Sequence, residues 1–274
     1  MSFNEVLNKI TSEGEFIVSE VETSKNGILK KGISIREAGS NVGPTFYPED
    51  YVMSDEELEG FIRDALENVP DAGEVQQLYE NFDSLTFGVK AQAKDTYIQP
   101  GTVYKEVLDV ILIPVVYVGK VGEYIGSTKV TEPLLSAWGK TIDEVFEKVD
   151  LSYTFMTMRE VLMDMMGTIP GLTEEEFPED DVPPMFVLSN EMRRDAGSLF
   201  FFEEVQKGIY EKIGGGYVVL PSSVHESIVL PIDTGDNINA LRTMVSEVND
   251  TQVSPEDRLT YSVYVYDGTE LKIA

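Results

Sequence analysis

The sequence predicts an α+β fold in which mixed, largely antiparallel sheets pack against helices in two lobes. Three observations lead to this prediction. Two β-rich runs flank Asn26-Gly27, a dipeptide that favours a tight turn between antiparallel strands. Apolar residues at helical spacing follow Ser54, which opens a capping box. The later helices and strands do not alternate as regular βαβ units, so an all-parallel sheet is not expected.

The N-terminal part is expected to form this hairpin followed by two helices. The first helix begins after Ser54, because the Ser54 hydroxyl and the Glu57 carboxylate can each accept a backbone N–H of the first turn. A second helix is expected over about residues 73–85, and both helices present acidic side chains to solvent. The hairpin strands are marked by their β-favouring side chains, Phe16, Val18, Val21, Ile28, Ile33 and Ile35.

The middle of the chain is expected to contain two strands and two helices. The apolar run 109–118 predicts a strand, and Pro114 places it at a sheet edge or a bulge because proline has no N–H for a ladder. A second strand is expected at residues 124–130, followed by a helix that a capping box at Thr141 opens. Residues 156–166 hold five of the ten methionines and favour a helix packed in the core over a soft, adaptable contact surface.

The C-terminal part is expected to form a lobe of its own. Residues 168–184 contain four prolines and a cluster of acids, which is typical of an exposed linker. This linker separates an N-terminal lobe, residues 1–167, from a C-terminal α+β lobe, residues 185–274. The elements expected in the C-terminal lobe are strands at 185–188, 217–220, 224–231 and 259–266 and helices at 196–213 and 237–248. The last helix is expected to bury Leu241, Met244, Val245 and Val248.

The composition excludes several kinds of site and predicts a cytoplasmic protein. The 274 residues include no cysteine, which excludes disulfides, cysteine nucleophiles, iron–sulfur clusters and thiolate zinc sites. Residues 1–16 carry three glutamates and no apolar stretch, so no signal peptide is expected. The longest apolar run, residues 110–118, is far shorter than the roughly 18–20 residues of a membrane span.

The net charge of −28, from 49 acidic and 21 basic residues, disfavours direct binding to nucleic acids or anionic membranes. Residues 49–83 hold twelve acids and one base, and residues 174–181 hold six acids and no base. Two interpretations stay open: a solvated surface of an acidic proteome, or an anionic face that binds a basic protein partner. The residues expected to contact such a partner are Glu56, Glu59, Glu67, Glu174, Glu175, Glu176, Glu179, Asp180 and Asp181.

The single histidine, His225, is a second candidate centre together with its neighbours Ser222 and Glu226. A helical zinc site needs a second histidine four positions further on, where this chain has Val229. Ser222 or Ser223 is not expected to reach His225 as a nucleophile from an adjacent strand, so hydrogen bonding that anchors a turn or a strand start is the simpler interpretation. No catalytic residue, metal ligand or cofactor is therefore predicted.

Several short stretches are similar to a known family. They are Asn26-Gly27, residues 44–47, Trp138-Gly139, residues 186–190, Ala196-Gly197, residues 220–226, and Met244-Val245 with Val248-Asn249 ahead of Val253. Together they resemble an uncharacterised family, a domain of unknown function, of acidic bacterial proteins from anaerobic Gram-positive lineages that are often linked to mobile elements. The resemblance covers most of the chain, with residues 220–226 as its most specific part. It implies no activity, cofactor or site residue.

The sequence thus favours a non-enzymatic acidic interaction protein. Its concrete form is a mobile-element or counter-defence protein that binds a basic, nucleic-acid-binding partner. The alternative is a carboxylate- or metal-dependent hydrolase of unknown substrate, and a purely structural protein is a third interpretation. A deep pocket where His225 and several acids converge favours the hydrolase, whereas an acidic convex face favours the interaction protein.

Overall fold

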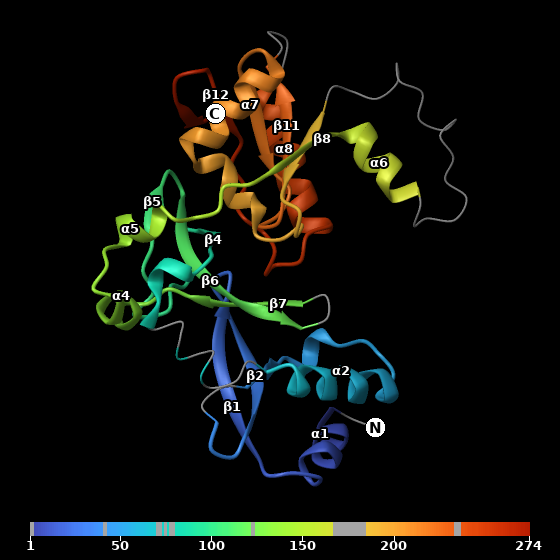
Figure 1. Cartoon of the computed structure of the whole chain (residues 1–274). Coiled ribbons are helices and arrows are strands. Elements are labelled where there is room, and N and C mark those ends of the chain that lie inside the picture. The colour runs from blue at the N-terminus through green and yellow to red at the C-terminus, as the bar shows by residue number, and fades with distance from the viewer. Residues whose placement is uncertain are drawn as a thin grey trace. The chain divides into compact units, whose positions relative to one another are not determined.

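The computed structural model describes residues 3–40, 43–69, 80–121, 124–166, 185–232 and 237–274, together with Gly73 and Gln76 (Figure 1). These residues form helices and three sheets of three, six and four strands, in which the strands are mostly antiparallel. The predicted α+β fold class is confirmed.

Two compact units can be distinguished. Unit 1 comprises residues 1–87, 97–103 and 115–148, and unit 2 comprises residues 88–96, 104–114 and 149–274. The chain therefore passes between the units several times before residue 149. The predicted division into residues 1–167 and 185–274 stays a prediction, and the expected linker 168–184 lies outside the described residues.

The N-terminal hairpin of unit 1 forms as predicted. Strands β1 (Phe16–Lys25) and β2 (Ile28–Glu37) pair antiparallel along their whole length. Both turn residues have a left-handed backbone, with φ of 46° at Asn26 and 77° at Gly27, as a two-residue type I′ turn requires. The short strand β3 (Thr45–Phe46) pairs with the other side of β2, so the order β1-β2-β3 leaves β1 at an edge of this sheet.

Helices α1 (Phe3–Thr11) and α2 (Asp55–Glu67) pack against this sheet, and the turn η1 (Pro48–Asp50) precedes α2. The predicted capping box is confirmed, because the Ser54 hydroxyl accepts the Glu57 N–H while the Glu57 carboxylate accepts the Ser54 N–H. Helix α1 was not predicted from the sequence. The apolar core of unit 1 is formed by Val6, Leu7, Ile10, Ile35, Phe46, Leu58, Ile62 and Ala65.

The four-stranded sheet is built around β6 (Val110–Val121), which pairs with β4 (Phe87–Ala93), β5 (Lys105–Val107) and β7 (Tyr124–Lys129). The predicted strands at 109–118 and 124–130 are confirmed. Pro114 was expected to mark a sheet edge or a bulge, and the edge alternative is wrong because β6 lies between β4 and β5. The ladder with β5 ends at Leu112 and the ladder with β7 begins at Val115. Pro114 therefore lies in the gap between the ladder with β5 and the ladder with β7, where no backbone N–H is needed as a hydrogen-bond donor.

The rest of unit 1 contains short helices around an aromatic cluster. Of the predicted helix 73–85, Gly73, Gln76 and Glu80 are helical, and residues 82–84 form the 3₁₀ turn η2 (Phe82–Ser84). Helix α4 (Glu132–Trp138) ends at a tryptophan whose ring centroid lies 5.4 Å from Phe82 and 5.8 Å from Phe87. Helix α5 (Ile142–Phe146) begins with the predicted capping box of Thr141 and Glu144.

Unit 2 contains the six-stranded antiparallel sheet, in the order β13-β12-β10-β11-β9-β8. Its strands are β8 (Thr154–Thr157), β9 (Phe186–Ser189), β10 (Tyr217–Pro221), β11 (Ser227–Pro231), β12 (Tyr264–Tyr266) and β13 (Leu271–Ile273). Central strand β10 is buried at every position. The predicted strands 224–231 and 259–266 are shorter than expected, since pairing begins only at Ser227 and Tyr264.

Four helical segments accompany this sheet: α6 (Met158–Met166), η5 (Ala196–Phe201), α7 (Glu203–Ile213) and α8 (Ile238–Thr251). The predicted helix 196–213 is thus split into a 3₁₀ and an α segment. The methionine-rich helix α6 is present, but within residues 158–164 none of its side chains is fully buried. Among the described residues, no helix combines the length and the apolar character needed to cross a membrane.

The predicted buried face of α8 is partly wrong. Met244 is 52% exposed and Val248 is 39% exposed, whereas Val245 and Asn249 are buried. Near the end of the helix Asn249 faces the core, because its side-chain amide donates a hydrogen bond of 2.9 Å to the carbonyl of Thr260. Asn249 is therefore buried in place of Val248, since its amide satisfies a buried backbone carbonyl.

Candidate functional site

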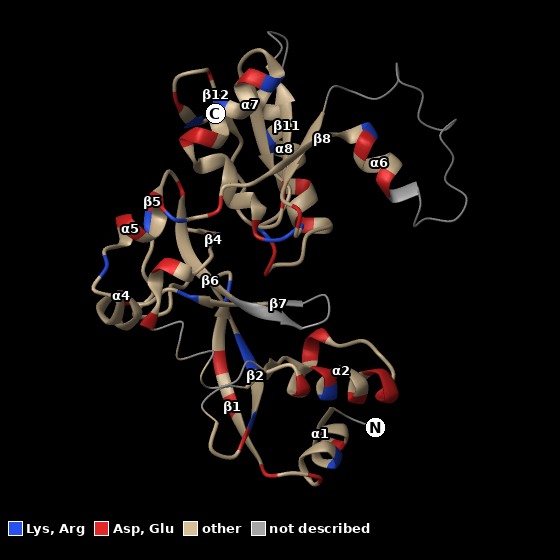
Figure 2. Cartoon of the chain, in the orientation of Figure 1, with Lys and Arg blue, Asp and Glu red and all other residues tan. Residues whose placement is uncertain are grey.

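Helix α2 carries the first group of predicted partner-contacting residues. It contains six acidic side chains and one basic side chain, Arg63, and Figure 2 shows acidic positions along α2 and on β1. Leu58, Ile62 and Ala65 are buried because they repeat at helical spacing toward the core of unit 1. The acidic side chains therefore occupy the other sides of the helix.

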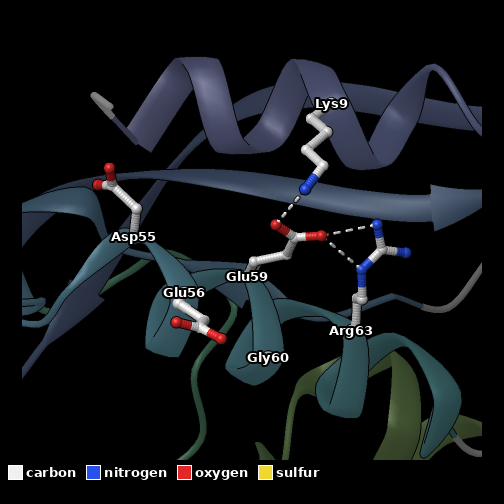
Figure 3. A pocket seen from close by; sticks show the side chains of 6 residues that line it. All are labelled: Lys9, Asp55, Glu56, Glu59, Gly60 and Arg63. Atoms are coloured by element: carbon white, nitrogen blue, oxygen red, sulfur yellow. Dashed lines mark hydrogen bonds and ion pairs between the residues drawn. The ribbon is translucent and has the colours of Figure 1, made fainter.

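Glu59 is neutralised by two basic side chains (Figure 3). Its carboxylate accepts hydrogen bonds from Lys9 Nζ at 2.6 Å and from Arg63 Nη2 at 2.9 Å, and Arg63 also binds Glu13 at 2.8 Å. The hydrogen bonds from Lys9 and then from Arg63 lower the pKa of Glu59 below its ordinary value. Glu59 thus joins α1 to α2, and its charge is compensated within the chain.

Glu56 and Glu67 differ from Glu59. Both side chains are exposed, and no hydrogen bond or ion pair engages either carboxylate within the described part of the chain. Residues eleven positions apart on an α-helix are separated by three turns and about 16 Å, so the two side chains leave the same side of α2. Arg63 lies between them along the helix, but its guanidinium turns to Glu13 and Glu59.

An open hollow of about 530 Å³ borders this part of α2. Its lining mixes acids and bases, and Figure 3 shows that Glu59 reaches toward Lys9 whereas Glu56 points away from it. Gly60 leaves space in the lining, since a Cβ there would meet no atom within 4 Å. The residues that line the hollow are Lys9, Asp55, Glu56, Glu59, Gly60 and Arg63.

The second group of predicted partner-contacting acids belongs to residues 168–184. Glu174, Glu175, Glu176, Glu179, Asp180 and Asp181 all lie outside the described residues. Their expected contact with a partner stays a prediction. Within the described residues, α2 is therefore the element that carries the predicted partner-contacting acids.

His225 lies before β11 in unit 2 and is engaged at both ring nitrogens. Nδ1 accepts the backbone N–H of Asp195 at 3.1 Å, and Nε2 lies 3.3 Å from a carboxylate oxygen of Asp257. Because Nδ1 is an acceptor, the neutral ring carries its proton on Nε2, directed at Asp257. These are the bonds expected of a residue that anchors a turn.

The other two residues of the predicted centre bind each other. Ser222 Oγ donates to the Glu226 carboxylate at 3.5 Å, in an exposed position. No hydrogen bond joins Ser222 to His225 among the described residues, so the serine is not held as a nucleophile by the imidazole. Within the same residues, no three His, Asp or Glu side chains gather in an arrangement suited to a metal ion.

The partners of His225 were not predicted from the sequence. Asp195 has a left-handed backbone with φ of 57°, and its carboxylate, 12% exposed, lies 3.5 Å from Lys90 Nζ. Aspartate is one of the few residues other than glycine that adopts this conformation readily. In the sequence, the one feature that points to Asp195 is its position directly before Ala196-Gly197, which begin the turn η5.

A second polar network of unit 2 was also missed. The Asp109 carboxylate accepts hydrogen bonds from the Tyr264 hydroxyl at 2.6 Å and from Ser262 Oγ at 2.7 Å. Burial, followed by the hydrogen bond to Asp109, raises the pKa of Tyr264. The phenol therefore stays protonated and serves as a hydrogen-bond donor that ties β12 to the residue preceding β6.

Two of the segments that carry the family resemblance meet in unit 2. The Gly197 N–H donates to the Val224 carbonyl at 3.0 Å. A Cβ at position 197 would lie 2.5 Å from the carbonyl oxygen of Ser223, so only glycine permits this approach. Ala196-Gly197 and residues 220–226 thus form one packing contact, with His225 beside it.

Comparison with known proteins gives the family of the chain. Neither the curated proteins nor the solved structures contain a significant match to it. The sequence profile of one family, DUF5688, described as a family of unknown function, matches residues 3–268. Because this match spans nearly the whole chain, the protein belongs to the DUF5688 family of unknown function.

Proposed function

We propose that the chain is a non-enzymatic interaction protein whose anionic surface on unit 1 binds a basic protein partner. The observation that carries the proposal is the pair of exposed carboxylates, Glu56 and Glu67, on one side of α2. The chain supplies these carboxylates with no cation of its own among the described residues. The net charge of −28 acts in the same direction, since it attracts basic proteins and repels phosphate backbones.

The spacing of the two carboxylates defines the kind of contact. At about 16 Å they are further apart than the Debye length of about 8 Å at physiological ionic strength, so each binds a separate cation of the partner. B-DNA carries one charge per roughly 1.7 Å of axis, which is a far denser pattern. The proposed mechanism is therefore electrostatic steering of a basic partner, without close imitation of a nucleic acid.

The narrower form of the proposal names a nucleic-acid-binding protein as the partner. It places the protein in the bacterial cytoplasm, as a mobile-element or counter-defence product. The alternative, a carboxylate- or metal-dependent hydrolase, draws no support from His225. Its Nδ1 is occupied by a backbone N–H and its Nε2 is directed at Asp257, which leaves neither nitrogen poised to act as a base.

The test is a titration of the whole chain with a lysine-rich histone as the basic probe. The double variant Glu56→Gln/Glu67→Gln is compared with Glu211→Gln/Glu247→Gln, which removes the same charge from exposed positions of α7 and α8. At low salt the α2 variant is expected to bind about threefold or more weakly than the control variant. Equal affinities for the two variants would mean that only total charge matters, and the proposal would be wrong.

A further inference from the structure

Strand β1 has an open edge. In the three-stranded sheet its only partner among the described residues is β2, so one side of its ten residues has no neighbouring strand. Ser19, Glu20 and Glu22 are exposed, and Ile17 and Val18 are 38% and 44% exposed. The exposed part of this edge, around residues 17–22, is a template onto which another chain can add a strand.

The backbone groups that face this edge can be assigned from the pairing with β2. In an antiparallel pair, residues alternate between those bonded to the partner strand and those that point away from it. The Ala38 N–H donates to the Glu15 carbonyl at 2.8 Å, which makes residue 15 a bonded position, so residues 16, 18, 20, 22 and 24 point outward. Consistent with this, the outward carbonyl of Ser24 accepts a hydrogen bond from the Lys129 side chain at 3.0 Å.

The N–H and C=O groups of Val18, Glu20 and Glu22 are thus directed away from β2. No backbone hydrogen bond uses them within the described residues. They form an uninterrupted row, because the strand contains no proline and no bulge between Phe16 and Lys25. Each outward residue offers one donor and one acceptor to an added strand.

The side chains of the same three residues share one face of the sheet. Val18 and Glu20 lie opposite Ile35 and Ile33, which belong to or pack against the core of unit 1, so this is the face that also carries α1 and α2. Glu22 lies opposite Lys31, and no ion pair joins the two side chains. The edge therefore combines one apolar and two acidic side chains at alternate positions.

We propose that the outer edge of β1 binds an extended basic segment of the partner as an added strand. Backbone hydrogen bonds to Val18, Glu20 and Glu22 would provide affinity, and Lys or Arg at alternate positions would lie opposite the two glutamates. A second copy of this chain is disfavoured at the edge, because antiparallel pairing centred on these residues brings Glu20 of one copy opposite Glu20 or Glu22 of the other. The inference rests on the proposed function and names the form of the partner.

The probe is a short peptide of alternating Lys and Val, titrated into the full chain. A matched peptide carries N-methyl groups on alternate residues, which removes the donors along one edge and leaves the charge unchanged. Loss of several backbone hydrogen bonds is expected to weaken binding about tenfold or more. Because this comparison uses the unaltered protein, it does not depend on the folding of any variant.

Two variants test the same edge from the protein side. Val18→Pro removes an outward N–H that makes no bond to β2, so the hairpin is kept while binding falls several-fold. Glu20→Gln/Glu22→Gln is expected to weaken binding and to flatten its salt dependence relative to Glu211→Gln/Glu247→Gln. In sedimentation the complex is expected at the mass of one chain plus one peptide. If the chain instead forms a dimer without peptide, and Val18→Pro abolishes that dimer, the edge binds a second copy of the chain and the proposed partner segment is wrong.

The outcomes separate this inference from the proposed function. Equal binding of the two peptides together with an unaffected Val18→Pro variant would overturn strand addition. The proposed function would still stand in that case if Glu56→Gln/Glu67→Gln weakens histone binding. Absence of any salt-sensitive binding to peptide or histone would overturn both.

Discussion

The ammonium group of Lys9 lies 2.6 Å from a carboxylate oxygen of Glu59, which links helix α1 to helix α2 across fifty residues of sequence. Together with Arg63, this contact divides the acids of α2 into two kinds. Glu59 is neutralised by basic side chains of the chain itself, whereas Glu56 and Glu67 are exposed to solvent with no ion pair in the described residues. The interaction proposed for unit 1 rests on the second kind.

Removing Lys9 is expected to increase binding to a basic partner. Lys9→Gln deprives Glu59 of one of its two cations, so the anionic surface gains net charge. The affinity for the histone at low salt should rise about two- to threefold, with little loss of stability because the ion pair is partly exposed. The measurement is a titration followed by urea unfolding, and unchanged affinity would argue against a contact surface at this end of α2.

The capping box of α5 is expected to make stability depend on pH. Hydrogen bonds from the Thr141 N–H, from Lys140 and from the Thr141 hydroxyl lower the pKa of Glu144 from 4.5 to about 2. The stabilisation by this carboxylate is therefore complete above its unfolded pKa of 4.5 and is lost as the pH falls toward about 2. Urea midpoints should show that Glu144→Gln differs most from the parent above about pH 5 and converges with it at lower pH. A difference that stays constant down to about pH 2 would contradict this.

Replacement of His225 tests its anchoring role. His225→Ala leaves the Asp195 N–H without its acceptor, and the expected loss is about 1–3 kcal/mol in the free energy of unfolding. His225→Asn places an amide oxygen near the position of Nδ1 and should lose clearly less. The comparison uses urea unfolding of both variants. If the alanine variant is as stable as the parent, the hydrogen bond to Asp195 does not anchor the turn.

Two glycine variants are expected to change stability in opposite directions. Gly197→Ala puts a Cβ 2.5 Å from the Ser223 carbonyl and 2.9 Å from the Val224 carbonyl, so the backbone must shift at a cost of about 1–3 kcal/mol. Gly60→Ala adds a methyl group to open space in the middle of α2 and should stabilise the protein by about 0.5–1 kcal/mol. Thermal unfolding of the two variants decides the matter, and a neutral Gly197→Ala would show that the contact between the two family segments is loose.

Elements with a local chemical signal were predictable from the sequence. The hairpin depends on two turn residues that adopt positive φ, and the starts of α2 and α5 depend on reciprocal bonds over three residues. All three are decided by neighbours in sequence. The same holds for the end of α7 at Gly214, whose φ of 80° fits a glycine cap.

Features that depend on segments far away in the sequence could not be predicted. Pro114 was expected at an edge or a bulge, and it lies instead between two ladders formed by strands that precede and follow β6. Met244 and Val248 were expected inside, but Asn249 is turned inward by the carbonyl of Thr260, eleven residues away. In both cases the position of another segment, which periodicity does not contain, determines which residue is buried.

The candidate site shows the same limit. The acidic character of α2 follows directly from composition, but the compensation of Glu59 depends on Lys9, and the partners of His225 come from positions 195 and 257. Charge counts treat all carboxylates alike. The structure separates those that bind within the chain from those that remain at the surface.

The most direct measurement is zero-length cross-linking of carboxylates to the lysines of the histone probe, followed by mass-spectrometric mapping. The proposal predicts that Glu56 and Glu67 of α2, together with Glu20 and Glu22 of β1, react first and that salt suppresses the reaction. Cross-links confined to unit 2, for example at Glu211 or Glu247, or distributed evenly over all exposed acids, would contradict an interaction surface on unit 1.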